Sequence, residues 1–258
     1  MLSIDLTERV VLVVGGSRGI GEAVTRAANE AGARVVFTHT GDPRHAAGVA
    51  VLQKELAARG SGAEAVALDA LDPGGAASLV ERIVRDRGRL DALVCNVGKN
   101  TARAAEALTD EQWDEGLATN LSATFYAVRA VLPPMLRAGH GKILLIGSSA
   151  VYDGGGGAID YAAAKGGLEG MMSYLCRTYT RRGILTNVIH PCVIETDLLK
   201  ARYADEESRK RLIQQIPAGR LGKPEDIGGL AAFLLSPWGD YICGQKILAD
   251  GGRTLFSK

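Results

Sequence analysis

The sequence predicts an α/β fold of the Rossmann type, a doubly wound parallel sheet with helices on both faces. Short apolar runs alternate with segments of helical periodicity from one end of the chain to the other, as in parallel sheets built from βαβ units. The apolar runs are continuous rather than alternating, as expected of strands that are covered on both faces. No linker, repeat or low-complexity tract interrupts this rhythm, so we expect one domain over residues 1–258.

The predicted strands are short apolar runs, several of them rich in β-branched residues. Such residues favour extended backbone and pack well on a pleated surface. The runs are Val10–Val14, Val35–Thr38, Val66–Leu68, Leu90–Cys95, Ile143–Ile146, Ile184–Ile189 and Lys246–Ala249.

The predicted helices lie between these runs. In the first, Ile20, Val24 and Ala28 recur at helical spacing, and Gly32 marks its end. The others cover Val49–Arg59, Ala76–Arg87, Glu111–Leu136, Tyr161–Arg181 and Pro224–Leu235. A polar stretch late in the chain breaks the alternation, and we expect residues 197–215 to form a helical lid over a substrate.

The composition excludes several classes of protein. Thirty basic and 29 acidic residues give a net charge of +1, so neither a nucleic-acid nor a membrane-binding surface is expected. No run of about 18 apolar residues could span a bilayer, and the first residues do not resemble a secretion signal, so we expect a cytoplasmic protein. The four cysteines and four histidines form no CxxC or HxxxH pair, and no metal site is expected.

A glycine-rich turn follows the first predicted strand and leads into the first helix. An ordinary tight turn would also use glycine, but three glycines at this spacing let backbone N–H groups approach a pyrophosphate at a helix N-terminus. The residues expected to hold this group are Gly15, Ser17, Arg18, Gly19, Ile20 and Gly21.

A second group of polar residues predicts acid–base chemistry. Tyr161 and Lys165 are four positions apart on a predicted helix and therefore project from one face. A nearby ammonium group would lower the pKa of the phenol from its usual value of about 10 towards the working range. Ser148 follows the strand Ile143–Ile146, at the strand end where ligands of open α/β sheets bind, and could hydrogen-bond a reacting oxygen.

Together, these features resemble the short-chain dehydrogenase/reductase family over essentially the whole chain. The family's TGxxxGxG turn corresponds to Val14–Gly21, its NNAG strand end to Cys95–Gly98, and its PG motif to Pro191-Cys192. Its helix asparagine corresponds to Asn120. Within the family, the sequence is most similar to the 3-oxoacyl-acyl-carrier-protein reductases.

The resemblance implies that a nicotinamide cofactor exchanges a hydride with a carbonyl carbon or a secondary alcohol. It implies that Tyr161 is the general acid/base, that Ser148 orients the oxygen and that Lys165 binds the nicotinamide ribose. Asn120 would support a proton relay through water. The further cofactor contacts that it implies are Asp69, Asn96, Gly98, Pro191, Ile194 and Thr196.

Four departures from the family pattern leave these catalytic groups intact. Val14 replaces a threonine whose hydroxyl ties the turn to a neighbouring strand. Cys95 and Val97 replace polar or small residues beside the expected ribose. Cys192 replaces a glycine and places a side chain beside the expected nicotinamide pocket.

The end of the second predicted strand bears on the choice of cofactor. An NAD-binding site usually carries a carboxylate there, whereas this chain has His39. Arg18 could pair with a 2′-phosphate, and Thr38, His39 and Thr40 could hydrogen-bond it. Asp42 lies close by, and its carboxylate would repel a 2′-phosphate. We therefore favour NADP(H) over NAD(H), which stays possible.

The substrate is expected to be a small carbonyl compound or alcohol, which an acyl carrier protein could carry. Arg129 and Arg177 occupy helical positions that meet the acidic carrier in the oxoacyl reductases, although arginine is common on exposed helices. Residues 99–103 depart from the sequence of those reductases. The alternatives are a dehydrogenase of sugars, polyols or other small alcohols, and a non-catalytic dinucleotide sensor.

Two predicted helices carry more apolar surface than one sheet face can bury, namely Glu111–Leu136 and Tyr161–Arg181. In the family these helices pair across a two-fold axis, and we expect a homotetramer with a dimer as the fallback.

Overall fold

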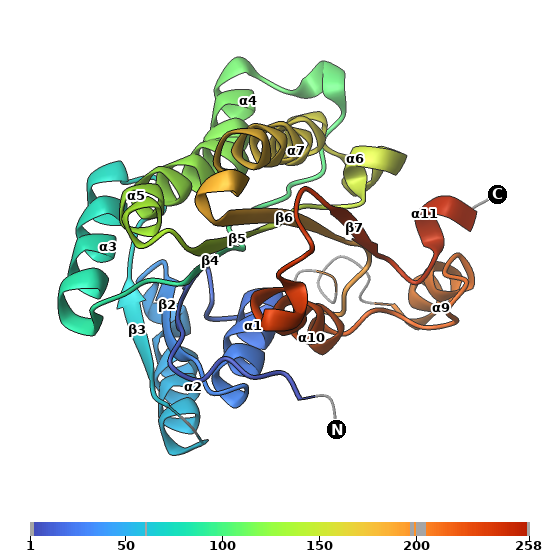
Figure 1. The fold of residues 1–258 in the computed structure, drawn as a ribbon. Helices are drawn as coiled ribbons and strands as arrows, with labels where there is room; N and C mark the ends of the chain where they lie inside the picture. Colours follow the sequence, from blue (N-terminus) through green and yellow to red (C-terminus); the bar gives the residue numbers. More distant parts are fainter. Residues whose placement is uncertain (1–2, 60, 197–198, 200–204, 257–258) are drawn as a thin grey trace.

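The computed structural model describes residues 3–59, 61–196, 199 and 205–256. Within them, seven strands form one parallel sheet in the order β3-β2-β1-β4-β5-β6-β7 (Figure 1). The strands are β1 (Val10–Val14), β2 (Arg34–His39), β3 (Ala63–Ala67), β4 (Ala92–Cys95), β5 (Gly141–Ile146), β6 (Ile184–Pro191) and β7 (Lys246–Ala249). The predicted fold class is confirmed.

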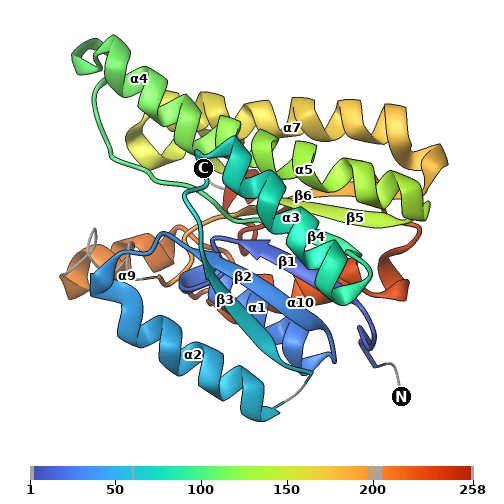
Figure 2. The ribbon, with the colours of Figure 1, turned by 90° about the vertical axis from the view of Figure 1, so that its left-hand side faces the viewer.

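Helices cover both faces of the sheet and make two separate cores (Figures 1 and 2). The helices α1 (Gly19–Glu30), α2 (Ala46–Arg59) and α10 (Pro224–Leu235) lie on one face, and α3 (Pro73–Arg87), α5 (Ala123–Ala138) and α7 (Ile159–Tyr179) lie on the other. Along β1, Val11 and Val13 join the first core, while Val10, Leu12 and Val14 join the second. This division follows from the two-residue repeat of a strand and explains why β1 is apolar throughout.

The order of the strands determines where a ligand fits. From β1 the chain proceeds to β2 and β3 on one side, and then crosses back to β4 on the other. The crevice at the carboxyl ends of β1 and β4 is the topological switch point, where open α/β sheets bind their ligands. The glycine turn follows β1 at that edge.

Several predicted elements have different bounds in the structure, and two of these differences have a clear physical cause. The helix expected over 111–136 is three pieces, α4 (Asp110–Leu117), a π-helical turn (Ala118–Ser122) and α5. The strand expected at Val66–Leu68 is β3, which begins three residues earlier. As an edge strand β3 is only partly buried, so its apolar pattern was too weak to show its start.

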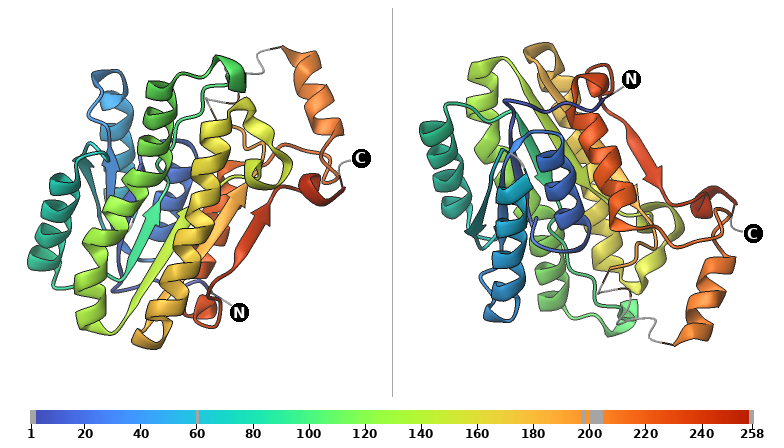
Figure 3. Two further views of the ribbon diagram at one scale, coloured as in Figure 1. Left: turned by 90° about the horizontal axis from the view of Figure 1, so that it is seen from above. Right: turned by 90° about the horizontal axis from the view of Figure 1, so that it is seen from below.

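The short helices α6 (Ala150–Asp153), α9 (Glu206–Gln214) and α11 (Arg253–Phe256) lie near one another at one end of the sheet (Figure 3). Of the lid expected over 197–215, α9 is described, and residues 197, 198 and 200–204 lie outside the described residues. Leu212 of α9 packs with Ile216 and Leu221 in a small third core. The closing motion of this segment stays a prediction.

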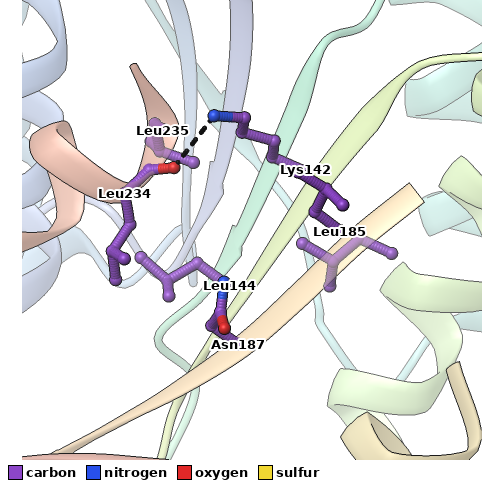
Figure 4. A pocket seen from close by; sticks show the side chains of 7 residues that line it. Lys142, Leu144, Leu185, Asn187, Leu234 and Leu235 are labelled. Atoms are coloured by element: carbon purple, nitrogen blue, oxygen red, sulfur yellow. Dashed lines mark hydrogen bonds between the residues drawn. The ribbon is translucent and has the colours of Figure 1, made fainter. Parts of the chain in front are cut away.

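A buried lysine, Lys142, attaches α10 to the sheet at the amino end of β5. Lys142 donates to the carbonyl oxygens of Leu234 at 3.1 Å and Ser236 at 2.5 Å, beside a small cavity (Figure 4). It also pairs with Asp240 at 2.6 Å. Lys142 is near the amino end of β5 and therefore lies away from the candidate site. Its ammonium group holds the end of α10 against the sheet.

None of the helices in the described part of the chain has the length and apolar character that a bilayer span requires.

Candidate active site

The turn after β1 is tied to β2. Thr38 accepts a hydrogen bond at its hydroxyl from Gly15 N (3.0 Å), and its carbonyl accepts one from Gly16 N (3.0 Å). Thr38 is buried and so is not available to a 2′-phosphate, contrary to our expectation. It supplies instead a hydroxyl that ties the turn to a neighbouring strand, the function that Val14 cannot perform.

Close packing explains the glycines of this turn. Gly15 has a φ of 76°, a conformation that favours glycine. A β-carbon at Gly21 would overlap the carbonyl oxygen of Gly15 and lie 2.6 Å from Nδ2 of Asn96. Asn96, after β4, donates to that same carbonyl at 2.9 Å. The turn, the start of α1 and the end of β4 therefore form one rigid cradle, and the first N–H groups of α1 lack partners within the helix.

Basic side chains gather where β2 ends. Arg18 Nη1 lies 3.0 Å from His45 Nε2, and His39 lies at the end of the same strand. Asp42 is engaged by Arg44 through contacts of 2.6–3.1 Å, which lower the pKa of Asp42 to about 2. The carboxylate that seemed to oppose a phosphate is thus paired with a cation. Sequence reasoning missed Arg44 and His45, because no motif marks this loop.

The side chain of Ser148 lies close enough to the Tyr161 phenol to lower its pKa through hydrogen bonding. Ser148 follows β5, and Tyr161 is in the first turn of α7, so strand and helix each fix one partner. Burial raises the pKa of Tyr161, and the hydrogen bond from Ser148 acts in the opposite direction. The two hydroxyls form a site where one substrate oxygen could be held and protonated.

Lys165 lies beneath this pair and is almost fully buried. Its Nζ donates to Ile146 O at 2.9 Å and to Val97 O at 3.2 Å, and lies 5.7 Å from the centre of the Tyr161 ring. Burial lowers the pKa of Lys165 to about 8. We expected Lys165, together with an oxidised nicotinamide, to lower the pKa of Tyr161; in the chain without cofactor, burial of the phenol raises that pKa.

The π-helical turn places Asn120 beside Lys165. The Asn120 side chain accepts from Lys99 N and donates to Lys99 O and Gly116 O, each at 3.0 Å. π-Helical turns inside α-helices occur frequently at functional sites. Gly98 passes over both groups, since a β-carbon there would lie 2.9 Å from Asn120 Oδ1 and 3.2 Å from Lys165 Nζ.

The segment after β6 returns to the glycine turn. Pro191 ends β6, Ile194 pairs with Gly222 in a parallel bridge, and Thr196 lies against Gly19. These residues therefore share the edge of the sheet expected to hold the cofactor. Asp69, which follows β3, is exposed and accepts from Leu71 N at 2.9 Å.

Cys192 has surroundings that the sequence did not reveal. Its thiol is buried and accepts from Arg253 Nη1 of α11 at 3.3 Å, and Arg253 also pairs with Asp153 of α6 at 3.3 Å. Cys192 therefore contacts α11 directly and, through Arg253, is connected to α6. Among the described residues, no cluster of three or more His, Cys, Asp or Glu side chains could hold a metal ion.

Comparisons with known proteins agree with this geometry. A family model described as enoyl-(acyl carrier protein) reductase matches residues 14–254. The chain is 37% identical over 247 residues to 3-oxoacyl-[acyl-carrier-protein] reductase FabG of Escherichia coli, covering 96% of this chain and 98% of the relative. It is 35% identical over 248 residues to L-rhamnose 1-dehydrogenase (NAD(P)(+)) of Azotobacter vinelandii, covering 96% and 97%.

A solved structure shows the same arrangement. The active-site complex of RhlG from Pseudomonas aeruginosa with NADP superimposes with a TM-score of 0.89 at 29% identity, covering 98% of each chain. The seven parallel strands, the glycine cradle and the Ser148–Tyr161–Lys165 group thus accompany full-length similarity to dehydrogenases and reductases. The chain belongs to the short-chain dehydrogenase/reductase family and is an NAD(P)-dependent oxidoreductase that acts on CH–OH and C=O groups.

Proposed function

We propose that the protein is an NADPH-dependent reductase of 3-oxoacyl thioesters. The observation that carries the proposal is the grouping of Ser148 and Tyr161 with buried Lys165, whose Nζ donates to Ile146 O at the carboxyl end of β5 and lies 5.7 Å from the centre of the Tyr161 ring. Two hydroxyls that can reach the same substrate atom suit a carbonyl oxygen, which gains negative charge during the reaction and then accepts a proton.

The cradle fits a dinucleotide, because the left-handed Gly15 and the start of α1 leave backbone N–H groups for a pyrophosphate. When bound, the nicotinamide supplies the hydride. Ser148 then orients the substrate oxygen, and Tyr161 gives it a proton. Lys165 has a pKa of about 8, so it is protonated at neutral pH and could return a proton to Tyr161. Asn120 holds the adjoining loop through its hydrogen bond with Lys99 N.

The remaining cofactor contacts complete this proposal. We assign the pyrophosphate to the residues of the turn and the nicotinamide side to the segment after β6. The residues assigned to the cofactor are Gly15, Ser17, Arg18, Gly19, Ile20, Gly21, His39, Asp69, Asn96, Gly98, Tyr161, Lys165, Pro191, Ile194 and Thr196.

The preference for NADPH rests on charge. Arg18, His45 and His39 lie near the end of β2, and the carboxylate of Asp42 in the same loop is paired with Arg44. A 2′-phosphate would meet positive or neutral groups there, and Arg18 could bind it through charge-assisted hydrogen bonds. The NADP in the RhlG complex supports this proposal.

The substrate class follows from the relatives and from surface charge. The E. coli relative is a reductase of 3-oxoacyl groups on acyl carrier protein. Arg129 and Arg177 are exposed on α5 and α7, where an acidic carrier could dock, and Arg129 stacks over the ring of Phe125 at 5.2 Å. The L-rhamnose dehydrogenase favours the second candidate, a sugar dehydrogenase. A non-catalytic sensor has no need of the intact Ser148–Tyr161–Lys165 group.

The protein is proposed to work as a homotetramer in the cytoplasm, where NADPH and acyl thioesters are available. Phe125 on α5 and Tyr174 on α7 are 44% and 63% exposed, which suits helices that pair between copies. Light scattering at micromolar concentration should show a tetramer, and a monomer would contradict this assembly.

A panel of substrates tests the proposal. Acetoacetyl thioester with NADPH should show loss of nicotinamide absorbance, and should turn over faster than with NADH. Crotonyl thioester tests the enoyl reduction that the family model describes. Turnover of L-rhamnose but not of the thioesters would favour the second candidate, and activity only with NADH would overturn the cofactor preference.

A further inference from the structure

The main chain of Ser148 is anchored to a side chain. Ser148 N lies 3.2 Å from Nδ1 of His190, and Ser148 O lies 3.0 Å from the same nitrogen. The N–H groups on either side of Ser148 donate instead to main-chain oxygens of β6. These two bonds are Gly147 N to Ile189 O at 2.7 Å and Ser149 N to Pro191 O at 3.1 Å. Three consecutive amides are thus held by three consecutive residues of β6, and the middle contact depends on an imidazole.

The imidazole of His190 is fully buried and closely packed. A β-carbon at Gly147 would lie 2.6 Å from Nδ1, so this glycine leaves the space that the ring occupies. The ring of Tyr152 packs edge-on against it, with centroids 5.3 Å apart. The ring can therefore turn very little, and the position of Nδ1 is well defined.

On its other side, the ring faces Glu169. His190 Nε2 lies 3.3 Å from Glu169 Oε1, at an angle outside that of a hydrogen bond. Glu169 also accepts from the hydroxyl of Tyr152 at 2.7 Å and pairs with Lys246 of β7. On α7, Tyr161, Lys165 and Glu169 are spaced four residues apart, so Glu169 continues the face that carries the candidate catalytic groups.

The charge of Glu169 selects the tautomer of His190. Burial lowers the pKa of His190, although the backbone of Ser148 and the charge of Glu169 oppose this effect. The neutral imidazole then carries one proton. Two observations favour a proton on Nε2: a lone pair there would face a carboxylate, and among the described residues Ser148 N has only Nδ1 as acceptor, whereas Ser148 O also accepts from Val151 N at 3.3 Å.

We propose that Glu169 and His190 are positioning residues, which hold Ser148 in the orientation that the reaction needs. This inference rests on the proposed reductase function of the Ser148–Tyr161 pair. Glu169 favours the proton on Nε2 of His190, so Nδ1 is free to accept from the amide of Ser148 and holds that residue in place. Neither residue touches the reacting atoms.

Two substitutions of His190 test the orientation of the ring, because each keeps a polar atom at only one of its nitrogens. In His190→Asn the side-chain amide reaches the place of Nδ1, and in His190→Gln it reaches the place of Nε2. We expect His190→Gln to lose about tenfold or more in kcat. We expect His190→Asn to stay within about threefold of wild type. The KM for NADPH should change little in both, because the glycine cradle is separate.

Glu169→Gln keeps a hydrogen-bonding group and removes the charge, and Glu81→Gln, at an exposed position of α3, is its matched control. We expect Glu169→Gln to lower kcat by several-fold and Glu81→Gln to leave it unchanged. Equal losses in His190→Asn and His190→Gln would overturn the proposal, because they would show a packing role. Full activity in both would overturn it as well.

The ¹⁵N spectrum of labelled histidine tests the same arrangement without turnover. We expect a neutral His190 with its proton on Nε2 at pH 7.5, and a spectrum with the proton on Nδ1 would overturn the proposal. If the wild-type enzyme and Ser148→Ala were equally inactive on every substrate, the reductase proposal would fail, and the positioning role with it. The histidine spectrum would still show whether Glu169 selects the tautomer, so the two failures are distinguishable.

Discussion

Gly98 is the position where adding a single methyl group should damage the candidate site most selectively. In Gly98→Ala, the new β-carbon would lie 2.9 Å from Asn120 Oδ1 and 3.2 Å from Lys165 Nζ. Both distances are shorter than ordinary van der Waals contact. One of the two side chains must therefore shift by a few tenths of an ångström.

The size of the effect follows from what Lys165 would lose. Its Nζ is held by Ile146 O at 2.9 Å and by Val97 O at 3.2 Å, and the second bond is already long. Loss of one hydrogen bond of a buried charged group costs about 1.5–3 kcal/mol. If the same free energy is lost from the transition state, because Lys165 is no longer held in place, kcat decreases by about 10- to 100-fold.

Steady-state kinetics with acetoacetyl thioester and NADPH measure this effect, and thermal unfolding shows whether the variant is folded. Gly48→Ala is the matched control, because a β-carbon at Gly48 in α2 would have nothing within 4 Å. A Gly98→Ala enzyme with kcat within threefold of wild type would refute the reasoning, since the contact with Lys165 would then be unimportant for turnover.

Three further predictions follow from charges at named positions. Arg18→Ala should raise the KM for NADPH by about tenfold and leave that for NADH unchanged, because only the former carries the 2′-phosphate; equal effects on both cofactors would contradict the proposed contact. Burial lowers the pKa of Lys165 to about 8, so the lysine is protonated below that pH, and kcat for carbonyl reduction should fall above it; a profile that rises through pH 8 would contradict its role as proton donor. Lys142→Met should lower the free energy of unfolding in urea by about 3 kcal/mol, because it removes the buried ammonium group that donates to Leu234 O and Ser236 O, while kcat stays unchanged.

Much of the fold could be predicted because a sheet covered on both faces leaves a strong pattern. The residues of β1 alternate between two cores, and both need apolar side chains. The start of β3 could not be predicted, since an edge strand is buried on fewer sides. The π-helical turn at Asn120 was also missed, because a shift in backbone hydrogen bonding changes neither composition nor apolar spacing.

The candidate site was predictable only in part. Motif spacing brought together Ser148, Tyr161 and Lys165, and the structure confirms that they are neighbours. The pairing of Asp42 with Arg44 and the contact between His190 and Glu169 depend on side-chain geometry. His190 and Glu169 are on different elements, and no local spacing connects them.

The central claim is that Tyr161 protonates a substrate oxygen while a nicotinamide supplies the hydride. The most direct measurement compares wild type with Tyr161→Phe in NADPH oxidation by acetoacetyl thioester, with binding of NADPH followed by fluorescence. We expect unchanged NADPH binding and a loss of about 10²–10⁴ in kcat. A Tyr161→Phe enzyme that keeps more than about a tenth of the wild-type rate would contradict the account, because general acid catalysis usually contributes far more.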